Sequence, residues 1–160
     1  MRKDKLTHIN EQGRARMVDI SSKEITEREA VAYACIYMKS ETLMRIKEGS
    51  IKKGDVLSVS QVGGIMACKN TWSIIPMCHN INLSSCDVKF NLDEENSKVD
   101  IYVNTKTTGQ TGVEMEALTA ASVAALTIYD MCKAIDREMT ITDVKLLKKT
   151  GGKSGSFVRE

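Results

Sequence analysis

The sequence predicts an α+β fold, in which one antiparallel sheet carries helices on one of its faces. Two observations lead to this prediction: a pair of neighbouring segments in which apolar and polar residues alternate, and a long segment without proline that has helical periodicity. The alternating segments are residues 86–92 and 99–104, and the helical segment is residues 112–135. The chain has 160 residues, so we expect a single domain over residues 1–160.

The first expected elements are a strand and two helices. Residues 30–38 have the composition of a strand, and residues 40–48 form a short helix with Ser40 as its N-cap. Residues 55–72 form a second helix that contains Gly63 and Gly64, although each mid-helix glycine costs roughly 1 kcal/mol. Two adjacent glycines there indicate either close contact with a neighbouring backbone or a break in the helix.

The alternating segments predict a hairpin. Apolar side chains occupy every second position of both segments, which is typical of strands with one buried and one wetted face. These residues are Cys86, Val88, Phe90, Leu92, Val99, Ile101 and Val103. The polar residues 93–98 lie between the segments and form the turn.

The long helix has an unusually wide apolar surface. One stripe of residues follows a spacing of three and four: Ala117, Ala121, Ala124, Ile128, Met131 and Ile135. A second apolar stripe lies beside it, so we expect this helix to be covered by its own sheet and by another subunit. A strand over residues 139–149 follows, and the resulting order βαββαβ is that of a ferredoxin-like fold. Residues 1–29 are expected to be a peripheral segment.

Composition and charge exclude several classes of function. Twenty-three basic and 21 acidic residues leave a net charge of +2, which argues against a general nucleic-acid-binding protein. The five cysteines are odd in number and include no C-x-x-C pair, so neither a disulfide framework nor a zinc ribbon is expected. Reduced thiols suit a cytoplasmic location. Residues 1–19 lack the apolar core of a secretory signal, and no apolar run predicts a membrane span.

Charged residues at the two ends of the long helix are the first candidates for chemistry. Asp130 and Lys133 lie one turn apart near its end, and they form either a surface ion pair or a carboxylate–ammonium pair for proton transfer. Glu114 and Glu116 lie at its start. They either complement the helix dipole or bind the edge of a purine or pterin.

Two further segments combine residues that suit ligand binding. In Pro76–His79, Cys78 precedes His79, which allows a Cys–His nucleophile as well as a purely structural role. Residues 148–155 contain Gly-Lys-Ser, but Leu147 stands where a phosphate-binding loop needs glycine. This segment is therefore either a flexible basic tail or a phosphate site built from backbone N–H groups and lysines.

Short segments spread along nearly the whole chain carry a resemblance to a known family. They are Leu6–His8, Met17–Asp19, Ser40–Leu43, Lys53–Val56, Ile75–His79, Thr111–Thr119, Tyr129–Ala134 and Gly151–Gly155. With these segments the sequence resembles the cyclic pyranopterin monophosphate synthase family, also called the molybdenum cofactor biosynthesis protein C family. The run from Thr111 to Ala134 is the most specific part of the resemblance.

The resemblance implies a lyase of molybdenum cofactor biosynthesis. Its substrate would be 3′,8-cyclo-7,8-dihydro-GTP, and its products would be cyclic pyranopterin monophosphate and pyrophosphate. The resemblance also implies a homohexamer built as a trimer of dimers, with active sites at the dimer interface. No redox cofactor and no protein-bound metal are expected, although Mg²⁺ could accompany the triphosphate.

The resemblance also implies roles for individual residues. It gives Asp130 the catalytic role, with Lys53 and Lys133 assisting in acid–base steps. It implies substrate binding by Met77, Cys78, His79, Glu114, Met115, Glu116, Lys149 and Arg28. The chain departs from the family pattern at Met77, where leucine is usual, and at Asn80, where proline is usual. Because Asn80 lacks the rigid φ of proline, we expect His79 to be held less firmly and the pocket to be less rigid.

Two rival interpretations belong to other classes. The first is a ferredoxin-like module that binds a nucleotide or pterin as a regulator without catalysis. The second is a structural subunit of a larger cofactor-making assembly. The combination of Asp130, Lys133 and Lys53 favours the enzyme, because a pure binding module has no need of a base beside a phosphate site.

Overall fold

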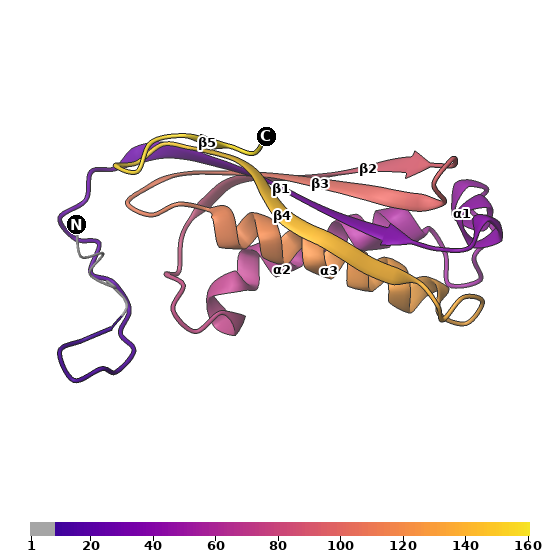
Figure 1. The fold of residues 1–160 in the computed structure, drawn as a ribbon, viewed down its shortest axis with the longest axis horizontal. Coiled ribbons are helices and arrows are strands. Elements are labelled where there is room, and N and C mark those ends of the chain that lie inside the picture. The colour runs from indigo at the N-terminus through magenta and orange to yellow at the C-terminus, as the bar shows by residue number, and fades with distance from the viewer. Residues whose placement is uncertain (1–8) are drawn as a thin grey trace.

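The computed structural model describes residues 9–160, and its main body is a twisted sheet with two long helices on one face (Figure 1). The elements, in chain order, are β1 (Thr26–Tyr37), α1 (Ser40–Lys47), α2 (Val56–Ile74), β2 (Leu83–Asp93), β3 (Lys98–Gly109), α3 (Glu114–Cys132), β4 (Thr140–Thr150) and β5 (Phe157–Val158). The expected α+β, ferredoxin-like architecture is confirmed. The segment Leu6–His8 of the family resemblance lies outside the described residues.

The sheet has the strand order β2-β3-β1-β4-β5, and every neighbouring pair is antiparallel. The strands β2 and β3 form the expected hairpin, in which Val88 pairs with Val103 and Asp93 pairs with Lys98. In its turn, the Asp93 carboxylate accepts a hydrogen bond from the Asn96 N–H at 3.0 Å. The alternating pattern therefore identified the hairpin and its turn correctly.

One polar position of this hairpin is buried, contrary to the alternating pattern. Asp100 faces away from the helices and is only 6% exposed. Its carboxylate accepts hydrogen bonds from the Tyr33 hydroxyl at 2.6 Å, the Lys98 ammonium at 2.8 Å and the Asn91 amide at 3.3 Å. These three donors replace the water that the pattern alone assigned to Asp100.

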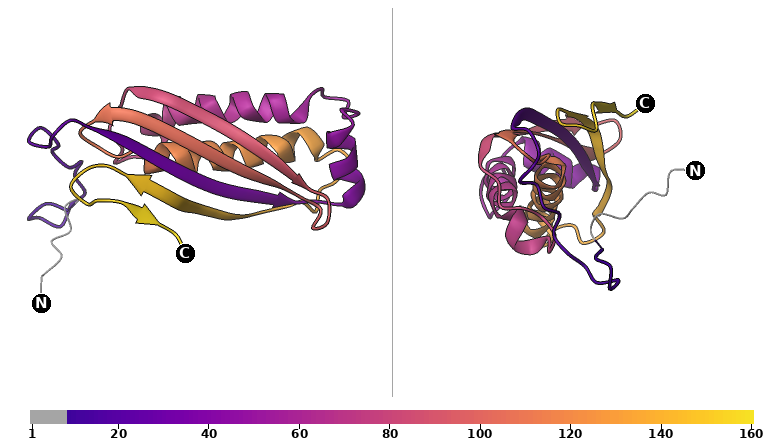
Figure 2. Two further views of the ribbon diagram at one scale, coloured as in Figure 1. Left: turned by 90° about the horizontal axis from the view of Figure 1, so that it is seen from above. Right: turned by 90° about the vertical axis from the view of Figure 1, so that its left-hand side faces the viewer.

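The helices α2 and α3 run antiparallel beside each other and cover one face of the sheet (Figure 2). The two glycines of α2 do not break the helix. A Cβ on Gly64 would lie 3.1 Å from the Ala120 carbonyl oxygen, and one on Gly63 would lie 2.8 Å from the Thr127 hydroxyl oxygen. Close approach between the two helices is therefore the reason for both glycines.

The core lies between the sheet and α3, and small side chains dominate both surfaces. Ala30, Ala32 and Ala34 of β1 are fully buried, as are Ala121 and Ala124 of α3. Larger buried side chains such as Ile36, Ile101 and Ile128 fill the space around them. Burial of one such isoleucine contributes about 2 kcal/mol, and close packing adds dispersion contacts.

Two expectations about local structure were wrong, and one strand was not expected. The strand β1 begins at Thr26, inside the segment expected to be peripheral, because residues 26–29 pair with 106–109 of β3. The N-cap of α1 is Lys39, not Ser40, and the Asp136 carboxylate accepts the Lys39 N–H at 2.8 Å. The basic C-terminal segment folds back, and its two-residue strand β5 pairs with Lys148 and Lys149 of β4.

Among the described residues, no helix has both the length and the apolar character needed to cross a membrane. All five cysteines, which lie within the described part of the chain, are free thiols.

Candidate functional site

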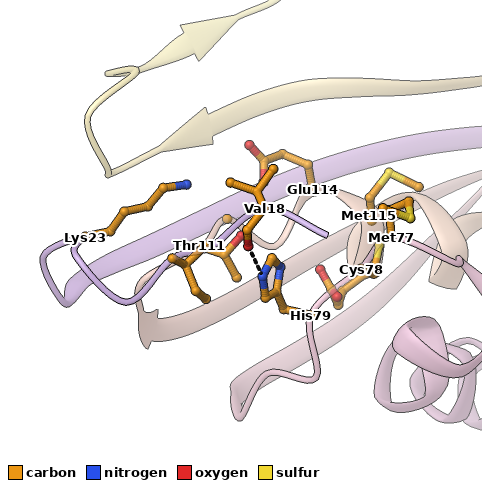
Figure 3. A pocket seen from close by; sticks show the side chains of 11 residues that line it. Val18, Lys23, Met77, Cys78, His79, Thr111, Glu114 and Met115 are labelled. Atoms are coloured by element: carbon orange, nitrogen blue, oxygen red, sulfur yellow. Dashed lines mark hydrogen bonds between the residues drawn. The ribbon is translucent and has the colours of Figure 1, made fainter. Parts of the chain in front are cut away.

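A cavity of about 340 Å³ lies at the end of the molecule where α2 ends and α3 begins (Figure 3). Three segments that are distant in sequence line it. The lining residues are Val18, Ile20 and Lys23 from the N-terminal segment, Met77, Cys78 and His79 after α2, and Thr111, Gly112, Glu114, Met115 and Glu116 at the start of α3. The structure thus brings together six of the residues that the resemblance assigned to substrate binding.

The segment that carries His79 is positioned by the end of α2. The helix ends at Ile74, and the Ile75 N–H still bonds to the Thr71 carbonyl at 2.9 Å. The Cys78 N–H then donates to the Ile75 carbonyl at 3.1 Å, which closes a tight turn. This turn directs Met77, Cys78 and His79 into the cavity.

Glu116 is the buried carboxyl group of this cavity. It lies in the first turn of α3, and its residue is only 4% exposed. Burial raises the pKa of Glu116 to about 7, because the charged form loses its hydration. Near neutral pH its carboxyl group therefore divides between a hydrogen-bond donor and a charged acceptor.

Cys78 faces the same cavity as a protonated thiol. Burial, together with the negative charge of Glu116, raises the pKa of Cys78 above its ordinary value. The described residues show no hydrogen bond between Cys78 and His79, whose Nε2 instead contacts the Val18 carbonyl oxygen at 2.8 Å. A Cys–His nucleophile, which the sequence left open, therefore has neither the thiolate nor the hydrogen bond it requires.

Glu114 connects the cavity to strand β4. Its carboxylate forms an ion pair with the Lys149 ammonium at 3.3 Å, and both side chains are less than one third exposed. A Cβ on Gly112 would collide with this carboxylate, so glycine at position 112 allows Glu114 to fold back towards the cavity. Lys149 does not line the cavity itself, but it lies at its edge through this pair.

Lys149 also binds the glycine-rich loop that follows β4. Its ammonium donates to the Ser154 hydroxyl at 2.7 Å. Gly151 and Gly152 have φ values of 88° and 75°, which favour glycine over other residues. The loop is thus a tight connection between β4 and β5, and it holds Lys149 in place.

Arg28 does not line the main cavity. Its Nε donates to the Gly109 carbonyl oxygen at 2.9 Å, at the end of β3, and its guanidinium packs against Gly152. Arg28 also lines a separate depression of about 260 Å³ together with Lys106 and Thr150. In this single chain its contacts connect the β3–α3 turn to the glycine-rich loop.

Asp130, Lys53 and Lys133 form a second cluster at the other end of α3. The Asp130 carboxylate binds the Lys133 ammonium at 2.7 Å and the Lys53 ammonium at 3.1 Å. The Lys53 ammonium also donates to the Asp130 carbonyl oxygen at 2.7 Å. All three side chains are about half exposed, and the ion pairs with Lys133 and Lys53 hold the pKa of Asp130 below its usual value.

The two clusters are separated by most of the length of α3. Asp130 follows Glu116 by 14 positions, and a helical rise of about 1.5 Å per residue makes their separation along α3 about 20 Å. One chain therefore does not bring Lys53, His79, Asp130 and Lys149 to a common point.

The N-terminal part of the cavity was not predicted. Val18, Ile20 and Lys23 line it, although the sequence assigned no binding role to these residues. Their only signal was the match of Met17–Asp19 to the family, because an irregular segment has no periodicity to interpret. Within the described chain, no group of three or more His, Cys, Asp or Glu side chains is arranged to hold a metal ion.

Comparisons with known proteins show which family the chain belongs to. A family model described as "MoaC family" matches residues 17–152. The chain is 70% identical over 155 residues to a protein of Thermoanaerobacter sp. (strain X514), covering 97% of this chain and 98% of that protein. It is 66% identical over 153 residues to one of Clostridium acetobutylicum, covering 96% and 95%, and 62% identical over 156 residues to one of Brevibacillus brevis, covering 98% and 97%. Each of these relatives is named cyclic pyranopterin monophosphate synthase.

Proposed function

The chain belongs to the MoaC family, and we infer that it is a cyclic pyranopterin monophosphate synthase. It converts 3′,8-cyclo-7,8-dihydro-GTP to cyclic pyranopterin monophosphate and pyrophosphate in molybdenum cofactor biosynthesis. The observation that carries this inference beyond the names of relatives is the cavity at the start of α3. There the Met77–His79 and Glu114–Glu116 segments, which the resemblance associates with substrate, line a single space.

The cavity suits the purine-derived part of the substrate. The Glu116 carboxyl group, with its pKa raised to about 7, both accepts hydrogen bonds from N–H groups and donates one when protonated. The Cys78 thiol and the Met77 and Met115 thioethers provide polarisable contacts for a flat ring. Lys149, held by Glu114 and Ser154, offers positive charge at the cavity edge for a phosphate.

The Asp130 cluster suits the acid–base steps and the departure of pyrophosphate. Asp130 remains ionised at neutral pH, since the pKa of its carboxyl group is lowered, and each of its oxygens holds one ammonium group. Lys53 and Lys133 can then give protons to leaving atoms and stabilise negative charge on the pyrophosphate. The reaction involves no overall change of oxidation state, so it needs no redox cofactor.

We propose that a second copy of the chain brings its Asp130 cluster to the cavity of the first. The separation of about 20 Å along α3 supports this arrangement, because one chain cannot place both clusters around one small substrate. A two-fold dimer would create two such sites, and three dimers would form the homohexamer that the resemblance implies. We expect neither nucleic acid nor a membrane as a partner, because the chain has a net charge of only +2.

Two further points belong to the same proposal. We expect any Mg²⁺ that accompanies the triphosphate to be held chiefly by phosphate oxygens, since the described carboxylates form no metal-binding cluster. We also propose a cytoplasmic location, which the five free thiols support.

The direct test is to incubate the purified protein with the cyclised GTP intermediate and to measure pyrophosphate and cyclic pyranopterin monophosphate. Release of both supports the enzyme. Tight binding without turnover by folded protein would instead support the non-catalytic, ligand-binding module.

A complementation experiment tests the shared site. Lys53→Ala and Glu116→Ala are each expected to be inactive, and co-expression of the two with different affinity tags should restore about a quarter of the wild-type turnover, from the mixed dimers that regain one intact site. The matched control is co-expression of Lys53→Ala with Asp130→Asn, which damage the same cluster and should not complement. Equal failure of both pairs would exclude a site shared between copies.

A further inference from the structure

An irregular segment crosses the cavity ahead of β1. We call residues 18–23 the strap, because they have no helix or strand and supply three of the residues that line the cavity. Figure 3 shows Val18 of the strap beside His79, with the hydrogen bond between them. The strap is therefore part of the site, and its position determines one wall of the cavity.

The contact with the strap determines which nitrogen of His79 carries the proton. The Nε2 atom lies 2.8 Å from the Val18 carbonyl oxygen. A carbonyl oxygen only accepts hydrogen bonds, so Nε2 must be the protonated nitrogen. In the neutral ring Nδ1 then carries a lone pair, and it makes no hydrogen bond to any of residues 9–160.

The local backbone does not hold the imidazole ring of His79 in position by itself. The next residue is Asn80, which lacks the ring that fixes φ in proline. The imidazole ring is held instead by the strap, through a carbonyl oxygen that lies 61 residues away in sequence.

Gln110 holds the strap in place. Its side-chain amide donates to the Ser21 carbonyl oxygen at 3.2 Å and to the Lys23 carbonyl oxygen at 3.0 Å. Gln110 lies on the turn between β3 and α3, directly before Thr111 and Gly112, which line the cavity. One side chain thus joins the strap to the turn that begins α3.

We propose that Gln110 is a positioning residue for His79. By holding the strap it keeps the Val18 carbonyl on Nε2, so that Nδ1 accepts a hydrogen bond from an N–H or O–H group of the bound substrate. The claim that Nδ1 accepts a hydrogen bond from substrate rests on the proposed function. The claim that Gln110 fixes the tautomer of His79 rests only on the contacts between the strap, Gln110 and His79.

Histidine NMR tests the ring directly, in the full-length protein without substrate. The chain has only two histidines, so a His8→Gln variant identifies the His79 signals. With histidine labelled with ¹³C and ¹⁵N, we expect the Nε2–H tautomer of the neutral ring in the wild type. Gln110→Ala should give a mixture of tautomers and lower kcat/KM by about 5-fold, because two hydrogen bonds to the strap are lost.

Two further variants provide the controls. Gln110→Lys retains N–H donors at this position and should keep the wild-type tautomer and rate. Gln12→Ala makes the same chemical change in the exposed N-terminal segment, where the described contacts involve only the Gln12 backbone N–H, and it should alter neither measurement.

The outcomes separate this proposal from the proposed function. A wild-type ring in the Nδ1–H form overturns the proposal, and so does Gln110→Ala with an unchanged tautomer, whatever its rate. A tautomer that depends on Gln110 in a protein without turnover would support the positioning role and contradict the proposed enzyme.

Discussion

The two ends of α3 carry acidic side chains in opposite environments. Glu116, at the start, is buried in the cavity, and loss of hydration raises its pKa to about 7. Asp130, at the other end, is exposed, and the ammonium groups of Lys133 and Lys53 lower its pKa. Position on a helix therefore says little about the protonation of a carboxyl group, because burial and nearby charge decide it.

This difference suits different tasks. A carboxyl group that changes protonation near neutral pH can adapt to the hydrogen-bonding edge of a bound ring. A carboxylate that stays ionised can hold two lysines in a fixed arrangement. Under the proposed function the helix separates recognition at one end from acid–base chemistry at the other, and the following substitutions test this division.

The largest effect is expected at the exposed end. Asp130→Asn removes the charge that holds both lysines, so kcat should fall by about 1,000-fold, within the range for loss of an acid–base group. The thermal unfolding midpoint should fall only slightly, because exposed ion pairs contribute little to stability. Pyrophosphate release and a thermal melt at fixed chain concentration measure the two effects. A variant with lower melting temperature but normal turnover would show that the cluster is structural.

The next effect concerns the buried end and depends on pH. Between about pH 4.5 and 7 the native Glu116 stays protonated while the unfolded side chain ionises, so the native state binds more protons and stability falls as pH rises. This residue should therefore lower the free energy of unfolding by up to about 3 kcal/mol between pH 4.5 and 8. Glu116→Gln should remove that decrease, as denaturant unfolding at both pH values would reveal.

Asp130→Asn serves as the comparison for this experiment. The pKa of Asp130 is lowered in the native state, so its stabilising contribution is lost as pH falls, which is the opposite direction. If both variants changed the pH dependence in the same direction, the contrast between the two ends would be wrong.

A smaller effect, on stability, is expected where α2 packs against α3 between its two ends. Gly64→Val places a branched side chain against the Ala120 carbonyl, which leaves only 3.1 Å for a Cβ, and overpacking should lower stability by about 2 kcal/mol. Met66→Val is the control, because Met66 lies on the exposed side of α2. Chemical denaturation of the two variants tests whether the spacing between the helices limits stability.

Helices and strands in which apolar residues recur at regular spacing were predicted well from the sequence. The alternation around Val88 and Val103 identified the β2–β3 hairpin, and the alanine stripe identified α3. These patterns are local, because each records which side of a strand or helix is buried. The start of β1 was missed because residues 26–29 are mostly polar and its pairing depends on β3.

Features that depend on distant contacts could not be derived from local patterns. The N–H of Lys39, the N-cap residue of α1, is bound by Asp136, which is 97 residues away in sequence. The burial of Asp100 depends on Tyr33, which is 67 residues away. At the site, family resemblance pointed to Met77–His79 and Glu114–Glu116, which line the cavity, but neither it nor periodicity predicted the contacts of Val18 with His79 or of Gln110 with Ser21 and Lys23.

The short strand β5 affects how much of the sheet edge is left unpaired. Strand β5 has only two residues, and it covers the β4 backbone only near Lys148 and Lys149. A long, flat outer strand would offer its unpaired N–H and C=O groups to other molecules and so promote aggregation, whereas a short one offers few. A chain that stopped before Phe157 would leave all eleven residues of β4 unpaired on this side, so the last residues shorten the exposed edge at the end of β4 that carries Lys148 and Lys149.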